Sequence, residues 1–204
     1  MKVLLINGSP HKNGCTYTAL NEVSKALKNN DVEREICHIG MKPIQGCIAC
    51  GKCYKTKKCA FEDDVYNNLF EKIKEADGII IGSPVYYAGP NGSLCALLDR
   101  LFYSASYLTT NKPAAAVVSC RRGGASAAFD RLNKYFTINQ MPVVTSQYWN
   151  SIHGNTAEEA KQDLEGLQIM RTLGNNMAWM LKNIKNSEEK LPQKKKKIST
   201  NFIR

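Results

Sequence analysis

Four cysteines stand close together in the first third of the chain. Cys47, Cys50, Cys53 and Cys59 follow the spacing C-x2-C-x2-C-x5-C. Four soft thiolate ligands within a short stretch suit a [4Fe–4S] cluster, whose ligands must converge on a small volume. The same thiolates could hold zinc, although zinc sites more often use two separated C-x-x-C pairs, or they could be redox-active or unligated thiols. The spacing favours metal binding, with a cluster as the first choice. Zinc and metal-free thiols are the alternatives.

The segment from Gly8 to Tyr17 has the composition of a phosphate-binding turn. It follows an aliphatic run and opens a predicted helix, whose free N–H groups and positive dipole end favour an anion. Because Gly14 is followed by Cys15 and Thr16, the loop lacks the lysine of a Walker motif, and it has no G-x-G-x-x-G pattern for a dinucleotide. The loop therefore suits one terminal phosphate held by neutral donors. Taken alone, it could also be an ordinary helix cap.

Two later loops hold groups that suit a flat heteroaromatic ring. One places Tyr86 and Tyr87 among glycines and prolines, which offer a rigid shelf and close backbone approach. The other pairs Arg121 and Arg122 with two glycines, and guanidinium groups can face the electron-rich edge of a flavin or a nucleotide phosphate. Loop packing of the tyrosines and surface ion pairs of the arginines are the alternatives.

Strands and helices alternate along the chain. The predicted strands cover residues 3–6, 32–39, 78–81, 114–119 and 143–145, and the predicted helices cover 17–27, 65–73, 94–101, 125–136 and 158–184. Such alternation gives parallel pairing, right-handed crossovers and helices on both faces of the sheet. We predict an α/β fold, a flavodoxin-like doubly wound five-stranded parallel sheet of order 2-1-3-4-5. The strand at 32–39 should be an edge strand, and Gly166 and Gly174 should bend the last helix.

This sheet order fixes where a ligand should bind. In open parallel sheets, ligands lie at the carboxyl ends of the strands, near the point where the strand order reverses. For order 2-1-3-4-5 that point lies between the first and third strands. The loops at residues 8–16, 83–92 and 119–124 are therefore expected to meet there.

Length and composition predict one domain. We assign residues 1–185 to it, with the cysteine-rich loop 46–62 inserted after the second strand, and residues 186–204 to a basic tail that ends in Phe202 and Ile203. The tail holds five lysines of a chain with net charge +10, and the other basic residues are interleaved with acids, so no nucleic-acid partner is expected. No apolar run reaches the length of a membrane span or signal peptide, and we expect a cytoplasmic protein without a membrane partner.

Several motifs resemble the NADPH-dependent FMN reductase family and its iron-sulfur flavoprotein branch. They are Gly8-Ser9-Pro10, Gly14-Cys15-Thr16, the stretch 76–86, Leu98-Asp99-Arg100, Trp149-Asn150, His153-Gly154 and the four-cysteine spacing. The resemblance covers residues 2–185. It implies FMN as prosthetic group, NADH or NADPH as reductant, and a homodimer or homotetramer that completes the flavin site across a subunit interface. In the iron-sulfur branch it also implies a cluster that passes electrons to FMN one at a time.

Position within these motifs implies three groups of FMN-binding residues. The phosphate would be held by Ser9, His11, Asn13, Cys15, Thr16 and Tyr17, the ring would be bordered by Pro84, Val85, Tyr86 and Tyr87, and its other side would be closed by Arg121, Gly123 and Gly124. The family usually has Gly-Asn-Thr where this chain has a cysteine at position 15. We expect that cysteine to loosen FMN without abolishing its binding. Similarly, Cys95 stands where the family commonly has a lysine.

We predict an FMN-dependent oxidoreductase that takes electrons from NAD(P)H and passes them to a flavin, a quinone or a protein acceptor. No side chain is assigned as catalytic, because the flavin carries the chemistry. The first alternative is an iron-sulfur and flavin electron carrier, reduced by ferredoxin, with little NAD(P)H activity. The second is a flavin-free regulatory module that kept the fold.

Overall fold

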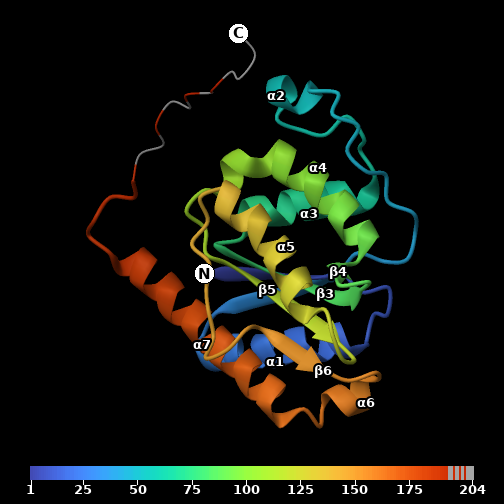
Figure 1. The fold of residues 1–204 in the computed structure, drawn as a ribbon. Coiled ribbons are helices and arrows are strands. Elements are labelled where there is room, and N and C mark those ends of the chain that lie inside the picture. Colours follow the sequence, from blue (N-terminus) through green and yellow to red (C-terminus); the bar gives the residue numbers. More distant parts are fainter. Residues whose placement is uncertain (193–194, 196–197, 199, 201–204) are drawn as a thin grey trace.

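The structure of the chain is a computed structural model that describes residues 1–192, 195, 198 and 200 (Figure 1). The predicted end of the tail at Phe202 and Ile203 lies outside the described residues. In chain order the elements are β1 (Lys2–Asn7), α1 (Cys15–Asn29), β2 (Glu33–His38), α2 (Lys52–Thr56), α3 (Asp64–Glu75), β3 (Gly78–Tyr86), β4 (Gly89–Pro90), α4 (Gly92–Thr109), β5 (Ala114–Cys120), α5 (Ala125–Ile138), β6 (Ser151–His153), α6 (Ala157–Ala160) and α7 (Leu164–Asn186). Within the described part, no helix is long and apolar enough to span a membrane.

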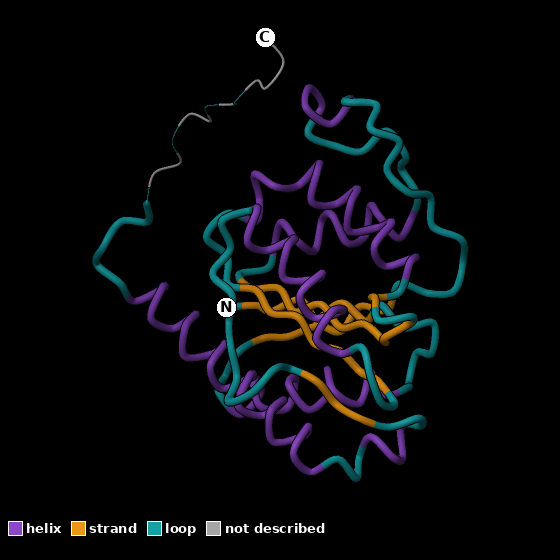
Figure 2. The backbone as a smooth tube through the Cα atoms, viewed as in Figure 1, coloured by secondary structure: helices purple, strands orange, loops and turns teal. Residues whose placement is uncertain are grey.

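One parallel sheet runs through the middle of the molecule. Figure 2 shows its strands in orange between two groups of helices. The strand order is β2-β1-β3-β5-β6, and β2 is an edge strand, as predicted. The short β4 pairs only with β3, antiparallel, as the return arm of a hairpin. Without that hairpin arm the order is 2-1-3-4-5, so the predicted flavodoxin-like sheet is confirmed.

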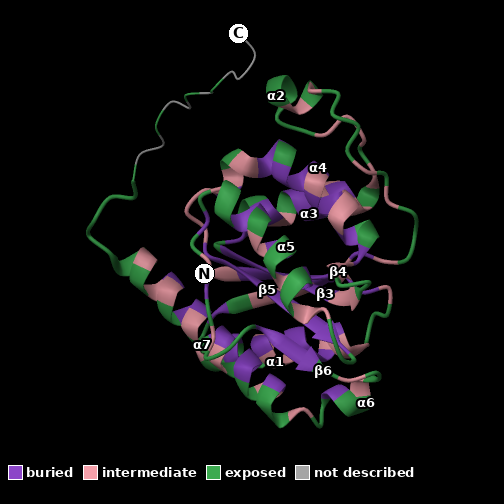
Figure 3. Ribbon diagram, viewed as in Figure 1, coloured by how far each residue is buried: buried purple, intermediate pink, exposed green. Residues whose placement is uncertain are grey.

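Helices cover both faces of the sheet and create two cores. Figure 1 shows α3, α4 and α5 on one face and α1 with α7 on the other. In β1, Leu4 and Ile6 pack into the first core while Val3 and Leu5 pack into the second, and all four are fully buried. Figure 3 shows buried residues, in purple, along the strands and on the helix faces turned toward them. A strand buried on both faces reads as a continuous apolar run, which is why the central strands were recognisable in the sequence.

The fifth strand differs from the prediction in position. At residues 143–145 only one bridge forms, between Val143 and Ala114. The chain then leaves β5 and returns as β6, where Ser151 pairs with Val118. Between these two pieces the side-chain amide of Asn150 donates to the carbonyl oxygen of Ala116 at 3.0 Å. A side chain thus takes the place of a backbone partner, and the predicted strand at 143–145 was wrong.

The last helix is broken where the sequence predicted one bent helix. The chain ends α6 at Ala160 and begins α7 at Leu164, with Asp163 as the α7 cap. The Asp163 carboxylate accepts from the Gly166 N–H at 2.9 Å and from the His153 N–H at 2.7 Å. Gly174 lies inside α7, where an added Cβ would come within 2.6 Å of the Ala26 Cβ. Gly174 thus permits close packing of α7 on α1, and the predicted single helix 158–184 is interrupted at residues 161–163, not at either glycine.

Candidate functional site

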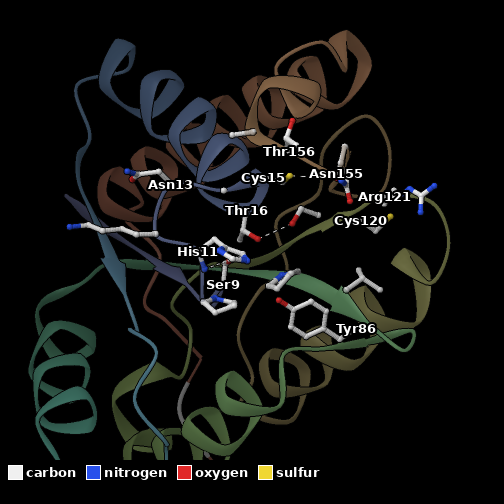
Figure 4. Close-up of a pocket in the computed structure, with 18 of the residues that line it drawn as sticks. Ser9, His11, Asn13, Cys15, Thr16, Tyr86, Cys120, Arg121, Asn155 and Thr156 are labelled. Atoms are coloured by element: carbon white, nitrogen blue, oxygen red, sulfur yellow. Dashed lines mark hydrogen bonds between the residues drawn. The ribbon is translucent and has the colours of Figure 1, made fainter.

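A cavity of about 1060 Å³ lies at the carboxyl ends of β1, β3, β5 and β6 (Figure 4). This is the edge where a doubly wound sheet binds its ligands. The loops at residues 8–16, 83–92 and 119–124 all contribute to its wall. Its lining consists of Ser9, Pro10, His11, Lys12, Asn13, Gly14, Cys15, Thr16, His38, Gly40, Met41, Pro84, Val85, Tyr86, Ser119, Cys120, Arg121, Gly154, Asn155, Thr156, Ala157 and Glu158.

The N-terminus of α1 opens into this cavity without a side-chain cap. Its N-cap residue is Gly14, which has no side chain to accept from the first N–H groups. Asp63 caps α3 and Asn91 caps α4 through side-chain oxygens, whereas α2 and α5 also begin at glycines without a side-chain cap, and their first residues do not line this cavity. The first N–H groups of a helix have no intrahelical partner, and they carry the positive end of the helix dipole. The start of α1 is therefore free to bind an anion.

The loop before α1 is held in shape from within the sheet. The buried Asn7 accepts from the Ser9 N–H at 3.1 Å and donates to the Lys12 carbonyl oxygen at 3.1 Å. His38 Nε2 lies 2.7 Å from the Ser9 carbonyl oxygen. Gly8 must be a glycine, because an added Cβ would lie 2.4 Å from the Leu94 Cδ2. These contacts give the loop a defined shape before any ligand is present.

Two hydroxyl groups connect the first and third loops across the floor of the cavity. Thr16 Oγ1 lies 2.8 Å from Ser119 Oγ, and both side chains are buried (Figure 4). The close approach of α1 to the sheet requires Gly82, where an added Cβ would lie 2.9 Å from the Thr16 Cγ2. The floor is thus polar but internally hydrogen bonded.

A tight hairpin forms the side of the cavity opposite the start of α1. Tyr87 and Ala88 connect β3 to β4 with φ of 49° and 59°, the left-handed values of a two-residue hairpin turn. Non-glycine residues adopt these values at some energetic cost. An added Cβ on Gly124 would come within 2.8 Å of the Ala88 Cα. The loop after β5 therefore packs directly against the hairpin, and this contact shapes the wall.

The structure brings most of the predicted FMN residues to one cavity. Its wall includes Ser9, His11, Asn13, Cys15, Thr16, Pro84, Val85, Tyr86 and Arg121 (Figure 4). The other four do not line it. Tyr17 is half-buried in the first turn of α1, Tyr87 projects from the hairpin tip, Gly123 is exposed, and Gly124 supports the hairpin from behind.

Two parts of the wall were missed by the sequence predictions. One follows β2 and includes His38, Gly40 and Met41, and the other is the stretch 154–158 after β6. The loops after all five parallel strands lie at the same edge of the sheet. The topology that predicts the first three loops at the cavity therefore also predicts these two. The second stretch was missed because the fifth strand had been placed too early in the chain.

Cys15 presents a neutral thiol to the cavity. Burial raises the pKa of this thiol, and the carboxylates of Glu159 and Glu158 raise it further. Its Sγ lies 3.5 Å from the Gly154 carbonyl oxygen, to which the thiol donates. A protonated thiol is a weak donor compared with an amide. Cys15 is therefore directed at the protein backbone in a position where a stronger donor could face a phosphate.

The four cysteines of the C-x2-C-x2-C-x5-C spacing border one small cavity. Cys47, Cys50, Cys53 and Cys59 line a space of about 80 Å³ together with Arg100 and Tyr103. Within the described residues, no three potential ligand side chains already converge as they would around a single ion. Four thiols around one cavity offer the soft ligands that a metal centre needs.

Backbone and side-chain N–H groups point at two of these sulfur atoms. The Ala49 N–H donates to Cys47 Sγ at 3.4 Å, and the Phe61 N–H donates to Cys59 Sγ at 3.4 Å. Arg100 Nε also donates to Cys59 Sγ at 3.4 Å. Such donors stabilise sulfur ligands that carry negative charge.

The sequence profile of the NADPH-dependent FMN reductase family matches residues 1–156. The chain belongs to this family. An iron-sulfur flavoprotein from Methanocaldococcus jannaschii is 35% identical over 193 residues, which is 91% of this chain and 100% of the relative. An iron-sulfur flavoprotein from Methanosarcina thermophila is 29% identical over 195 residues, which is 93% of this chain and 100% of the relative. The predicted family and its iron-sulfur flavoprotein branch are confirmed.

Solved structures with low sequence identity share the fold. A flavodoxin from the domain Archaea superposes with a TM-score of 0.60 at 17% identity, over 89% of this chain and 99% of that one. FerB from Paracoccus denitrificans, a flavoenzyme NAD(P)H:(acceptor) oxidoreductase, superposes with a TM-score of 0.64 at 14% identity, over 89% and 97%. Membership of the FMN reductase family, on a flavodoxin-like fold, supports an FMN-dependent oxidoreductase.

Proposed function

We propose that the chain binds FMN in the 1060 Å³ cavity and uses it to carry electrons from NADH or NADPH to a flavin, a quinone or a protein acceptor. The observation that carries the proposal is the uncapped start of α1, which opens into this cavity opposite the β3–β4 hairpin. When bound, FMN supplies hydride acceptance and the release of electrons singly or in pairs. The protein residues bind and orient it.

The phosphate of FMN would lie at the start of α1. There the N–H groups of Cys15 and Thr16 are available, and Ser9, His11 and Asn13 border the same end of the cavity. Backbone N–H groups bind a phosphate without a counter-cation, which agrees with the lack of a Walker lysine. Tyr17 does not line the cavity, so we assign it a packing role beneath the phosphate loop.

The isoalloxazine ring would lie against the hairpin. Pro84, Val85 and Tyr86 offer a stiff apolar border, and Arg121 stands on the wall formed by the loop after β5. Ligand cavities hold about 300–1,000 Å³, so this cavity is large enough for FMN, and a nicotinamide nucleotide or an acceptor would approach beside the ring. Its Arg121 guanidinium could face either the ring edge or a nucleotide phosphate.

We propose a [4Fe–4S] cluster held by Cys47, Cys50, Cys53 and Cys59. The four thiols border one cavity, and N–H groups already face two of the sulfur atoms. The M. jannaschii and M. thermophila relatives are both named iron-sulfur flavoproteins, which agrees with this choice. A cluster would add a one-electron route to the two-electron chemistry of FMN.

The second candidate function is an electron carrier with little NAD(P)H activity, reduced by ferredoxin. The feature that favours it is the cysteine cavity, because a flavin reductase that uses only nicotinamide needs no iron-sulfur cluster. Lys52, Lys55, Lys57 and Lys58 lie among the cysteines, and such basic residues suit an acidic redox protein.

The proposal also includes the organisation of the chain. Residues 1–185 form the flavin domain, residues 186–204 form a basic tail, and two or four copies assemble into a homodimer or homotetramer. We place the protein in the cytoplasm, where thiols stay reduced.

The visible spectrum of anaerobically purified protein tests the proposal. We expect flavin bands on top of broad iron-sulfur absorption, and FMN, iron and acid-labile sulfide on chemical analysis. Rapid bleaching by NADH or NADPH supports the reductase, whereas bleaching only by reduced ferredoxin or dithionite supports the carrier. A colourless protein that stays colourless after incubation with FMN would contradict both and would favour the flavin-free module.

A further inference from the structure

Arg100 is the largest fully buried side chain among the described residues, with 1% exposure. It lies on α4, between the helix and the cysteine-rich loop. Arginine is almost never fully buried unless its charge and N–H groups are paired, because removing the guanidinium from water is costly. A fully buried arginine therefore needs hydrogen-bond and charge partners, and these partners explain its position.

Among the described residues, every polar partner of the Arg100 guanidinium lies in or next to the cysteine-rich loop. Its Nε donates to Cys59 Sγ at 3.4 Å, and Nη1 donates to the Gln45 carbonyl oxygen at 3.2 Å. Nη1 also lies 2.6 Å from Asp63 Oδ2, and Nη2 donates to the Phe61 carbonyl oxygen. One side chain thus fastens the start, the end and the last thiol of the loop to α4.

The charges around Arg100 are unequally exposed. The Arg100 side chain is 0% exposed, whereas the side chain of its carboxylate partner Asp63 is 42% exposed. Water screens the exposed carboxylate more than the buried guanidinium. Part of the positive charge therefore remains effective toward the cavity, where a thiolate cluster would place negative charge.

We propose that Arg100 is a positioning residue for the cysteine cavity, which holds the loop in its ligand-binding shape and raises the reduction potential of the cluster bound there. A reduced cluster carries one more negative charge than an oxidised one, so a nearby cation and an N–H donor to sulfur favour the reduced state. This inference rests on the proposed cluster. It assigns to Arg100 a role that its position in the Leu98-Asp99-Arg100 motif does not reveal.

Three variants distinguish an effect of Arg100 on the cluster potential from a role that only fastens the cysteine-rich loop. Arg100→Met removes the charge and all N–H donors, Arg100→Lys keeps the charge, and Asp63→Asn removes the opposing carboxylate. Asparagine is as good an N-cap as aspartate, so Asp63→Asn preserves the start of α3. All four proteins, wild type included, are purified anaerobically and analysed for FMN, iron and sulfide before a redox titration followed by absorbance and by electron paramagnetic resonance.

We expect opposite shifts of the cluster potential. Arg100→Met should lower the potential and the iron content, Arg100→Lys should restore part of both, and Asp63→Asn should raise the potential. FMN content should stay at the wild-type level in all variants, because the two cavities share no lining residue. In metal-free protein, Arg100→Met should also speed the alkylation of Cys59, since the loop is no longer fastened.

The outcomes distinguish this inference from the proposed function. If the wild type holds FMN but no iron or sulfide, both the cluster and the role of Arg100 are overturned. If the wild type holds a cluster and its potential is the same in Arg100→Met and Asp63→Asn, only the role of Arg100 is overturned. If Arg100→Met does not fold, the signs of the shifts in Arg100→Lys and Asp63→Asn decide, and shifts of the same sign contradict the inference.

Discussion

At the scale of single residues, Cys15 and the glycines around the cavity set the shape of its wall and the donors that the wall offers. Cys15 occupies the first position of α1, yet its thiol donates to the Gly154 carbonyl oxygen. Gly8 and Gly82 bring backbone segments closer than any side chain would allow. These positions make the cavity sensitive to changes of only a few atoms.

We expect Cys15→Asn to tighten FMN binding about tenfold. An amide donor to a charged phosphate contributes about 1.5–3 kcal/mol, and part of this is offset by the lost thiol contact and by ordering of the side chain. Fluorescence titration of the apoprotein with FMN measures the effect. Cys95→Ser, on α4 and outside the cavity wall, should leave the affinity unchanged. Equal affinity of Cys15→Asn and wild type would show that Cys15 does not face the phosphate.

Gly8→Ala should destabilise the protein by about 1–3 kcal/mol and weaken FMN binding. The new Cβ would lie 2.4 Å from Leu94 Cδ2 and 2.9 Å from the Gly82 carbonyl oxygen, so β1 and α4 must move apart. Urea unfolding gives the free energy. Gly92→Ala is the matched control, because nothing lies within 4 Å of an added Cβ there, and it should change stability little. Similar losses of unfolding free energy in Gly8→Ala and Gly92→Ala would contradict the close packing assigned to Gly8.

At the scale of elements, α1 and α7 form the layer that covers one face of the sheet. Gly174 brings their backbones together, and Arg171 Nη1 of α7 lies 2.8 Å from Glu22 Oε1 of α1. Burial raises the pKa of Glu22, but hydrogen bonds from Arg171 and Lys25 outweigh it and bring the pKa below its usual value. The folded state therefore favours the ionised form of Glu22.

Glu22→Gln should cost about 0.5–1 kcal/mol at neutral pH and progressively less in acid. A carboxyl with a depressed folded-state pKa stabilises the fold above its unfolded pKa of about 4.3, and this contribution is lost as the pH falls through the folded value. Urea unfolding of both proteins across that range measures the difference. Glu71→Gln, in an exposed pair with Lys74 on α3, should show little effect at any pH. A Glu22→Gln difference that does not depend on pH would contradict the ion pair.

The burial and hydrogen bonding of whole elements explain which of them could be predicted from the sequence. The central strands β1, β3 and β5 are apolar on both faces, so their runs are continuous and unmistakable. In β6 a single apolar residue, Ile152, lies between two polar ones, so this strand has no apolar run. Asn150 bonds to β5 through its side chain, and hydrophobic periodicity does not predict such a contact. The break before α7 depends on Asp163, whose carboxylate also binds the His153 N–H ten residues away. Both misplacements came from tertiary hydrogen bonds of polar side chains.

The residues of the candidate site also fall into those that the sequence predicts and those that it does not. Loops after long buried strands were found because the strand order fixes the edge at which they meet. The stretch 154–158 was missed with β6, and His38 was missed because its role is to hold the Ser9 carbonyl oxygen. The burial of Arg100 could not be predicted from the sequence either, since its partners are two backbone carbonyl oxygens, the Cys59 sulfur and the Asp63 carboxylate, all of them far from it along the chain.

At the scale of the whole molecule, the surface beside the flavin cavity predicts assembly. Tyr87 is fully exposed at the tip of the hairpin, although its backbone adopts a costly left-handed conformation. We expect light scattering to show a dimer or tetramer, and Tyr87→Asp to lower the mass and weaken FMN binding. Tyr148→Asp changes an exposed tyrosine outside the cavity wall and should do neither. A wild-type monomer, or an unchanged mass in Tyr87→Asp, would contradict the prediction.

The flavin cavity and the cysteine cavity have no wall in common. Damage to one therefore need not reach the other. Oxygen attacks exposed iron-sulfur clusters, and Cys47 and Cys50 are both exposed to solvent. We expect a sample brought into air to turn from brown to yellow, as iron is lost while FMN stays bound and is still reduced by NAD(P)H. The chain would then work as a plain flavin reductase in air and as a two-centre protein only in its absence.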